Sequence, residues 1–95
     1  MRQYELMVII QGDAGDEGVA TLVDTIRGWI EGQNGNIVRI DNWGRRHLAY
    51  PINKQREGYY VLFTVDLLTA AVTELERNLR ISEDVLRYLT VRLDE

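Results

Sequence analysis

The spacing of the apolar residues alternates between two periods along this chain, and the order of those periods limits the fold more than any other feature. Residues 3–10 are rich in β-branched and aromatic side chains and carry an apolar residue at every even position, which predicts a strand. From Val19 the apolar residues recur every three or four positions, which is the spacing of a helix. Their stripe consists of Val19, Leu22, Val23, Ile26 and Ile30. We expect Asp16 to cap the start of this helix, and Gly32 or Gly35 to end it.

Two more strands are predicted in the middle of the chain. Residues 36–41 alternate with a slip of one residue, which indicates a β-bulge. After an irregular Trp43-Gly44 step, the strand is expected to resume over residues 45–52. Residues 54–58 predict a polar turn, and residues 59–67 then form the clearest strand in the sequence, with an apolar residue at each odd position.

The last third of the chain completes the order. Thr69 is expected to cap a second helix, whose apolar stripe consists of Val72, Leu75 and Leu79. Residues 85–93 predict a last strand, and either of its faces is apolar enough to be buried. The resulting order is βαββαβ in 95 residues, which is one domain, residues 1–95. The architecture predicted is a ferredoxin-like α+β sandwich, with a four-stranded antiparallel sheet and two helices on one face.

This architecture leaves one sheet face without a helix, and that face is expected to be polar unless something binds it. Here it is apolar. The residues that point to it from the first and third strands are Met7, Ile9, Tyr60 and Leu62, and the last strand adds either Leu89 and Val91 or Leu86 and Tyr88. An apolar patch of this kind indicates an interface with a protein partner.

The bases are gathered in one place although the chain is acidic. Residues 45–56 hold four Arg or Lys side chains and no acid, whereas the other 83 residues hold seven bases and fifteen acids, for a net charge of −4. Clustered bases bind phosphates through counterion release, although exposed bases are also commonly only solvated. The apolar face beside them favours a ribonucleoprotein component that contacts both protein and RNA. The bases concerned are Arg45, Arg46, Lys54 and Arg56.

Catalytic chemistry has little support in the sequence. The chain has no cysteine, which excludes disulfides and thiolate chemistry. The one histidine, His47, lies among arginines and is expected to be a bystander or a phosphate contact. Asp13 and Asp16 are more typical of a solvated loop than of a metal site, and with Glu17 they would repel a phosphate in an acylphosphatase-like enzyme. We therefore expect no enzymatic activity, no metal and no cofactor.

An RNA-recognition motif has the same βαββαβ order. Its third strand carries two aromatic residues separated by a small one, so that both rings stack on bases. Here Tyr59 and Tyr60 are adjacent and point to opposite faces, so only one of them could stack on a base. The match to this motif is therefore incomplete.

The stretch from Trp43 to Lys54, WGRRHLAYPINK, followed by Gly58-Tyr59-Tyr60, resembles the signature of protein six of the bacterial small ribosomal subunit. The start of the chain, MRQYE, and the later segments 79–81 (LRI) and 85–87 (VLR) match the same family. The resemblance covers essentially the whole chain and implies the βαββαβ fold. It also implies a structural protein of the small subunit, located in the cytoplasm, that binds the central domain of 16S ribosomal RNA as a heterodimer with small-subunit protein eighteen.

The resemblance and the charge pattern together assign two surfaces. The RNA contacts expected from the family signature are Arg2, Arg46, Lys54 and Arg87, to which the basic run adds Arg45, His47 and Arg56. The protein-partner face is expected to comprise Met7, Ile9, Tyr60, Leu62, Leu89 and Val91. Tyr4 and Tyr50 are expected to be core residues whose hydroxyls reach the rim. No membrane contact, small-molecule substrate or long C-terminal extension is expected, and the alternative is a ferredoxin-like ligand-binding or homodimerising module.

Overall fold

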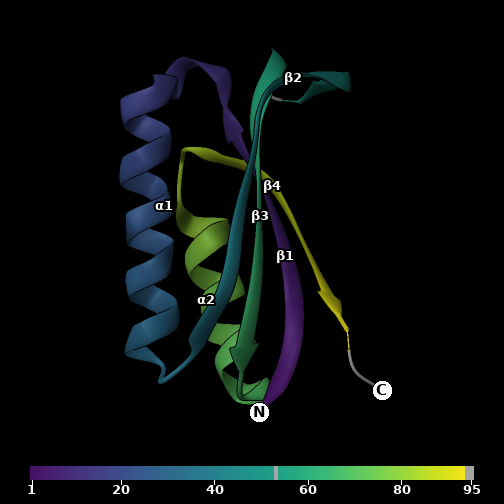
Figure 1. The fold of residues 1–95 in the computed structure, drawn as a ribbon. Coiled ribbons are helices and arrows are strands. Elements are labelled where there is room, and N and C mark those ends of the chain that lie inside the picture. The colour runs from purple at the N-terminus through teal and green to yellow at the C-terminus, as the bar shows by residue number, and fades with distance from the viewer. Residues whose placement is uncertain (53, 94–95) are drawn as a thin grey trace.

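The structure is a computed structural model that describes residues 1–52 and 54–93. The elements are β1 (Arg2–Gln11), a short 3-10 helix η1 (Gly12–Ala14), α1 (Gly15–Gly32), β2 (Asn36–Ile52), β3 (Gln55–Leu67), α2 (Thr69–Ile81) and β4 (Val85–Arg92). The strands form one antiparallel sheet in the order β2-β3-β1-β4. Both α-helices lie on the same face of that sheet (Figure 1). The predicted fold class is therefore confirmed.

The core lies between the sheet and the helices, and it is built from alternate residues of the two central strands. Even residues of β1 pair with odd residues of β3, as in Leu6 opposite Phe63 and Val8 opposite Val61, and these side chains are buried. The predicted stripe of α1 packs onto them, although Val23 is only partly buried. Because the helices cover this face of the sheet, the inward side chains of both strands are almost fully buried. Neither α-helix of the described residues is long and apolar enough to cross a membrane.

The helix starts differ from the sequence prediction. Helix α1 begins at Gly15, so Asp16 lies within its first turn, and no side chain caps the helix. Asp16 is still favourable there because its carboxylate faces the positive end of the helix dipole. Thr69 is the first residue of α2 rather than its cap, and its hydroxyl lies 3.3 Å from that of Tyr4. Tyr4 is buried, as predicted for a core residue whose hydroxyl reaches the rim.

The end of α1 depends on close packing at Gly35. The left-handed residue after the helix is Asn34, with φ of 61°, so neither Gly32 nor Gly35, the glycines expected to end the helix, takes this conformation. Gly35 donates its amide to the carbonyl of Ile30 at 2.9 Å. A Cβ atom at Gly35 would lie 2.5 Å from Leu67 Cδ2 and 2.8 Å from Ile30 Cγ2. Gly35 is therefore required because two buried side chains occupy the space that a larger residue would need.

Gly35→Ala is expected to destabilise the fold by about 1–3 kcal/mol, the usual range for an overpacked core. The free energy of unfolding in urea would measure this effect. Gly28→Ala is the matched control, because nothing lies within 4 Å of a Cβ on that helical glycine and alanine is the better helix former. An equal loss of stability in the two variants would contradict the packing role of Gly35.

Strand β2 is continuous but irregular. Its pairing with β3 shifts register between Ile37 and Arg39, between Asn42 and Gly44, and between His47 and Ile52. The first shift confirms the predicted bulge. The Trp43-Gly44 step is a second bulge within one strand rather than a break between two. Gly44 has φ of 81°, a conformation that favours glycine, and its amide donates to Asn42 Oδ1 at 2.8 Å.

The predicted polar turn at residues 54–58 is wrong. Strand β3 begins at Gln55, and Lys54 is the only turn residue of that segment. The last pairing between β1 and β3 joins Gln11 and Gly58, so residues 55–57 pair only with β2. The hairpin therefore projects past the sheet as a two-stranded ribbon (Figure 1). Residues 55–57 are polar although they form part of a strand, because water reaches a two-stranded ribbon from both sides.

Candidate functional site

Pairing in the hairpin divides the basic run between the two faces of the ribbon. Gly44 lies opposite Tyr60, Arg45 opposite Tyr59, and Arg46 opposite Gly58. Paired residues share a face and successive residues alternate, and Tyr59 faces the helices. Arg45 and His47 are therefore on the helix side, whereas Arg46 is on the open side with Tyr60. The sequence places these bases together but cannot indicate this division.

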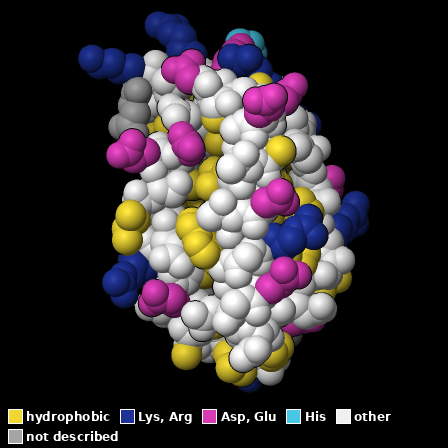
Figure 2. Space-filling model, turned by 90° about the vertical axis from the view of Figure 1, so that its left-hand side faces the viewer, with side chains coloured by type: hydrophobic (Ala, Val, Ile, Leu, Met, Phe, Trp, Pro, Cys, Tyr) yellow, Lys and Arg dark blue, Asp and Glu magenta, His cyan; other side chains and the backbone are white. Residues whose placement is uncertain are grey.

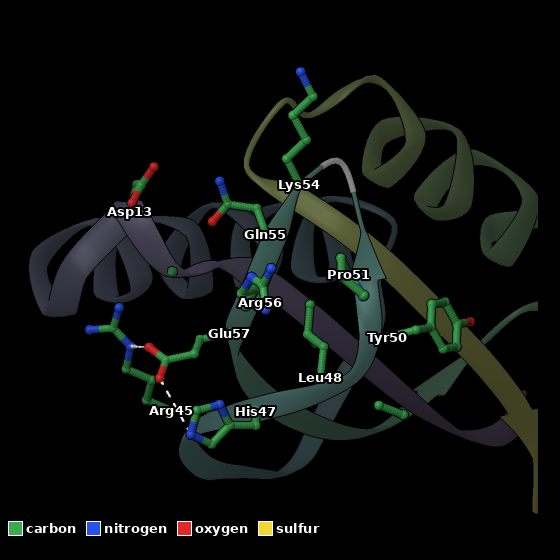
Figure 3. Close-up of a pocket in the computed structure, with 12 residues that line it drawn as sticks. Asp13, Arg45, His47, Leu48, Tyr50, Pro51, Lys54, Gln55, Arg56 and Glu57 are labelled. Carbon is green, nitrogen blue, oxygen red and sulfur yellow. Dashed lines mark ion pairs between the residues drawn. The ribbon is translucent and has the colours of Figure 1, made fainter.

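Glu57 engages the two bases on the helix side. Arg45 Nε lies 2.7 Å from Glu57 Oε1, and His47 Nε2 lies 3.6 Å from Glu57 Oε2, as drawn in Figure 3. The second contact is an ion pair only when the imidazole is protonated. The Arg45 guanidinium also lies 5.7 Å from the ring centroid of Tyr59. These contacts offset part of the positive charge that the sequence assigned to the run, because Glu57 directly follows its last base.

The other three bases of the hairpin remain available. Within residues 1–52 and 54–93, no acid forms an ion pair with Arg46, Lys54 or Arg56. All three are exposed. Lys54 sits at the hairpin turn with φ of 67°, and Figure 3 shows its side chain extended away from the ribbon. Exposed, unpaired bases on a projecting ribbon are suited to contact phosphate oxygens.

The hairpin also encloses a hollow of about 680 Å³ on the side of η1 (Figure 3). The hollow is lined by hairpin residues between Arg45 and Glu57, and by Gly12 and Asp13 of η1. Figure 2 shows the histidine and several bases at this end of the molecule, with acidic side chains spread over the helix face. The electrostatic contrast between the hairpin and the rest of the surface is therefore retained in the fold.

Arg87 and Arg2 occupy different regions. Arg87 lies on β4 opposite Ile9, and its guanidinium donates to the Tyr50 hydroxyl and lies 5.8 Å from that ring centroid. This contact joins β4 to the hairpin. Tyr50 is 54% exposed, so its predicted core position is wrong. Arg2 pairs with Leu67, at the other end of β1 from the hairpin, about 30 Å along a strand of this length. The structure does not bring Arg2 to the other bases.

The open face of the sheet is apolar across three strands. Met7, Ile9, Tyr60 and Leu62 are half-buried on it. The register of β4 resolves which of its faces joins them, because Leu89 pairs with Met7 and Val91 with Glu5. Leu89 is 62% exposed and Val91 43%. Tyr88 packs instead against the core, and its hydroxyl accepts from Arg80 Nη1 at 2.9 Å.

One residue of the site was missed by sequence reasoning. Trp43 is 41% exposed and stacks on Tyr60 with ring centroids 6.5 Å apart and planes 7° from parallel. It lies where the open face meets the hairpin. The only signal in the sequence is the irregular Trp43-Gly44 step, which indicates a break in the strand but not the direction of the Trp43 side chain.

Comparison with known proteins gives consistent similarities. The family described as "Ribosomal protein S6" matches residues 3–92. The "Small ribosomal subunit protein bS6" of Bartonella tribocorum is 43% identical over the whole chain, which covers 70% of that protein. The protein of the same description from Brucella canis is also 43% identical over the whole chain, which covers 64% of it.

Solved structures give the same picture. The crystal structure of the 30S ribosomal protein S6 from Thermotoga maritima superposes with a TM-score of 0.92 at 31% identity, over 97% of this chain and 87% of that one. The C-terminal domain of the MgtC protein from Mycobacterium tuberculosis superposes with a TM-score of 0.61 at 13% identity, over 98% of this chain and 88% of that one. The second likeness shows the fold alone.

Proposed function

This chain belongs to the ribosomal protein S6 family of the small ribosomal subunit, and on that basis we propose that it binds the central domain of 16S ribosomal RNA as a heterodimer with small-subunit protein eighteen. Its role in this proposal is structural rather than catalytic. The observation that carries the proposal is that a hairpin adjoins an exposed apolar sheet face and bears three basic side chains that form no ion pair with the acids of residues 1–52 and 54–93. One surface is suited to phosphates and the other to a protein.

The partner is assigned to the open face because that face resembles an interface core rather than a solvated surface. It includes Leu89 at 62% exposure and Val91 at 43%, and a hollow of about 390 Å³ lies between β1 and β4, lined by Met7, Ile9, Arg87, Tyr88 and Leu89. Exposed apolar area of this kind is typical of a protein contact. The anionic backbone of RNA would not bind this apolar area favourably.

The RNA contacts are assigned to the hairpin, with Arg46, Lys54 and Arg56 as the principal phosphate ligands. Arg45 and His47 share Glu57 and contribute less in this arrangement. Three bases are a small footprint, and the net charge of −4 repels RNA at long range. We therefore expect weak RNA binding by the isolated chain and strong binding only when the partner supplies further positive charge.

Replacing both Arg46 and Lys54 with alanine is expected to lower the affinity of the heterodimer for ribosomal RNA. It should also make the slope of log affinity against log salt shallower by about two units, since each phosphate contact contributes about 0.9 for a duplex. Mobility-shift titrations at several salt concentrations, with the two proteins mixed beforehand, would measure the slope. Heterodimer formation should not change.

The matched control removes two bases from the helices, Arg27 and Arg77, which are exposed and remote from the hairpin. Both double variants change the net charge equally, so a general charge effect would lower both slopes to the same extent. An unchanged slope in the hairpin variant would mean that the basic run is only a solvated surface and that the RNA contacts lie elsewhere.

A further inference from the structure

Trp43 is held in an exposed position by the geometry of a bulge. The register of β2 against β3 shifts between Asn42 and Gly44, so Trp43 is the extra residue, without a cross-strand partner. Bulges re-aim side chains in this way. The left-handed Gly44 and its hydrogen bond to Asn42 hold the backbone in place. By contrast, the other tryptophan, Trp29, packs against the core.

The ring of Trp43 has two neighbours, the ring of Tyr60 and the guanidinium of Arg46. It lies nearly parallel to the ring of Tyr60 at a centroid separation of 6.5 Å, a separation at which parallel rings are offset sideways rather than superposed. The two rings therefore lie next to one another in parallel, offset planes. The Arg46 guanidinium lies 5.5 Å from the Trp43 ring centroid, and no acid of the described residues forms an ion pair with it. Planar groups and a cation thus meet at one exposed point.

We infer that Trp43 and Tyr60, flanked by Arg46, form a stacking platform for one unpaired nucleobase of RNA. The inference rests on the proposed function and adds the class of RNA element that is contacted. Sequence-tolerant RNA contacts combine two elements. Aromatic rings stack on nucleobases that are free of the RNA duplex, and Arg or Lys side chains bind the phosphate backbone. A base inside a duplex presents no free face for stacking, so the contacted nucleotide lies in a loop, bulge or junction.

A nucleobase suits the Trp43 end of the open face better than the protein partner does, so Tyr60, which the sequence predicts as a partner residue, is assigned here to RNA instead. Trp43 comes from β2 on the hairpin side of the open face, and β3 and β1 separate β2 from the exposed β4 residues Leu89 and Val91. Arg46, whose guanidinium lies over the ring and has no acidic partner among residues 1–52 and 54–93, provides a cation for the phosphate that accompanies a stacked nucleobase. An apolar partner side chain would gain nothing from that cation and would have to desolvate it.

The test is the affinity of the heterodimer for the central-domain fragment of 16S ribosomal RNA, measured at several salt concentrations. Trp43→Ala is expected to weaken binding roughly 5- to 150-fold, the range for removal of one base–aromatic stack. The salt slope should stay unchanged, because stacking releases no counterions. Trp43→Phe, which keeps a ring, should retain most of the affinity. Val38→Ala should have no effect, since Val38 is the 51%-exposed extra residue of the β2 bulge between Ile37 and Arg39.

A second readout follows the ring directly. In a Trp29→Phe background Trp43 is the only tryptophan, and its fluorescence should be quenched by the RNA fragment but not by the partner protein alone. Quenching by the partner alone, or weaker heterodimer formation by Trp43→Ala, would assign the ring to the protein interface and overturn the inference. Unchanged RNA affinity in Trp43→Ala would overturn it too, while leaving the proposed function intact. If the heterodimer with Trp43 present does not bind the fragment, the proposed function fails first.

Discussion

Leu89→Asp is expected to weaken the proposed pairing with small-subunit protein eighteen severely while leaving the isolated chain folded. Leu89 is 62% exposed on the open face opposite Met7, so a carboxylate there remains in water in the free protein. In the heterodimer the same carboxylate would be buried without a partner, which costs at least about 3 kcal/mol and weakens binding more than about 100-fold. Titration calorimetry of the two proteins would measure the loss, with circular dichroism as the check on folding.

The choice of Leu89 over Leu62 follows from the sheet register. Leu62 lies directly opposite Asp41 on β2, and like charges in that arrangement destabilise a sheet. A defect of Leu62→Asp could therefore arise from the fold. The matched control is Ile81→Asp, since Ile81 is 69% exposed at the end of α2 on the helix side. If both variants bind the partner normally, the open face is not the interface.

Leu75→Ala is expected to lower the free energy of unfolding by roughly 2–5 kcal/mol, the usual range for a large-to-small change in a core. Leu75 is buried in the stripe of α2 that faces the sheet. The loss includes the removed apolar area and the cavity that remains. Urea denaturation would measure it. Leu68→Ala provides the control, because Leu68 precedes the same helix and is 52% exposed. Equal shifts of the two midpoints would contradict the burial of Leu75.

The sequence predicted the fold because the spacing of apolar residues differs between the strands and the helices. Strict alternation in residues 59–67 identified the buried face of β3, and it was confirmed residue by residue at Tyr59, Val61, Phe63 and Val65. In contrast, the register of β4 could not be predicted, since Leu86, Tyr88, Leu89 and Val91 make both of its faces apolar. Only the pairing with β1 distinguishes them.

The site was predicted less completely because its arrangement depends on contacts between residues that are distant in the sequence or opposite each other on two strands. The charge of Arg45 and His47 was visible, but their shared contact with Glu57 depends on hairpin register. Likewise, Arg87 meets Tyr50 across 37 positions of sequence. The exposed position of Trp43 could not be predicted, because the sequence does not show which side of the strand the extra residue of a bulge faces. The predicted caps at Asp16 and Thr69 were wrong because α1 begins at Gly15 and α2 at Thr69, so that both residues lie inside the first turn.

The central position of β1 has a consequence for how the protein is made. The first strand pairs with β3 through residues as far as Leu67 and with β4 through residues as far as Arg92. Contacts that span most of the chain form slowly and late, and synthesis proceeds from the N-terminus. The sheet therefore stays incomplete until translation has passed Arg92. Leu89 and Val91 lie on that last strand, so a nascent chain lacks part of the proposed partner surface, and we expect pairing with the proposed partner only after β4 has joined the sheet.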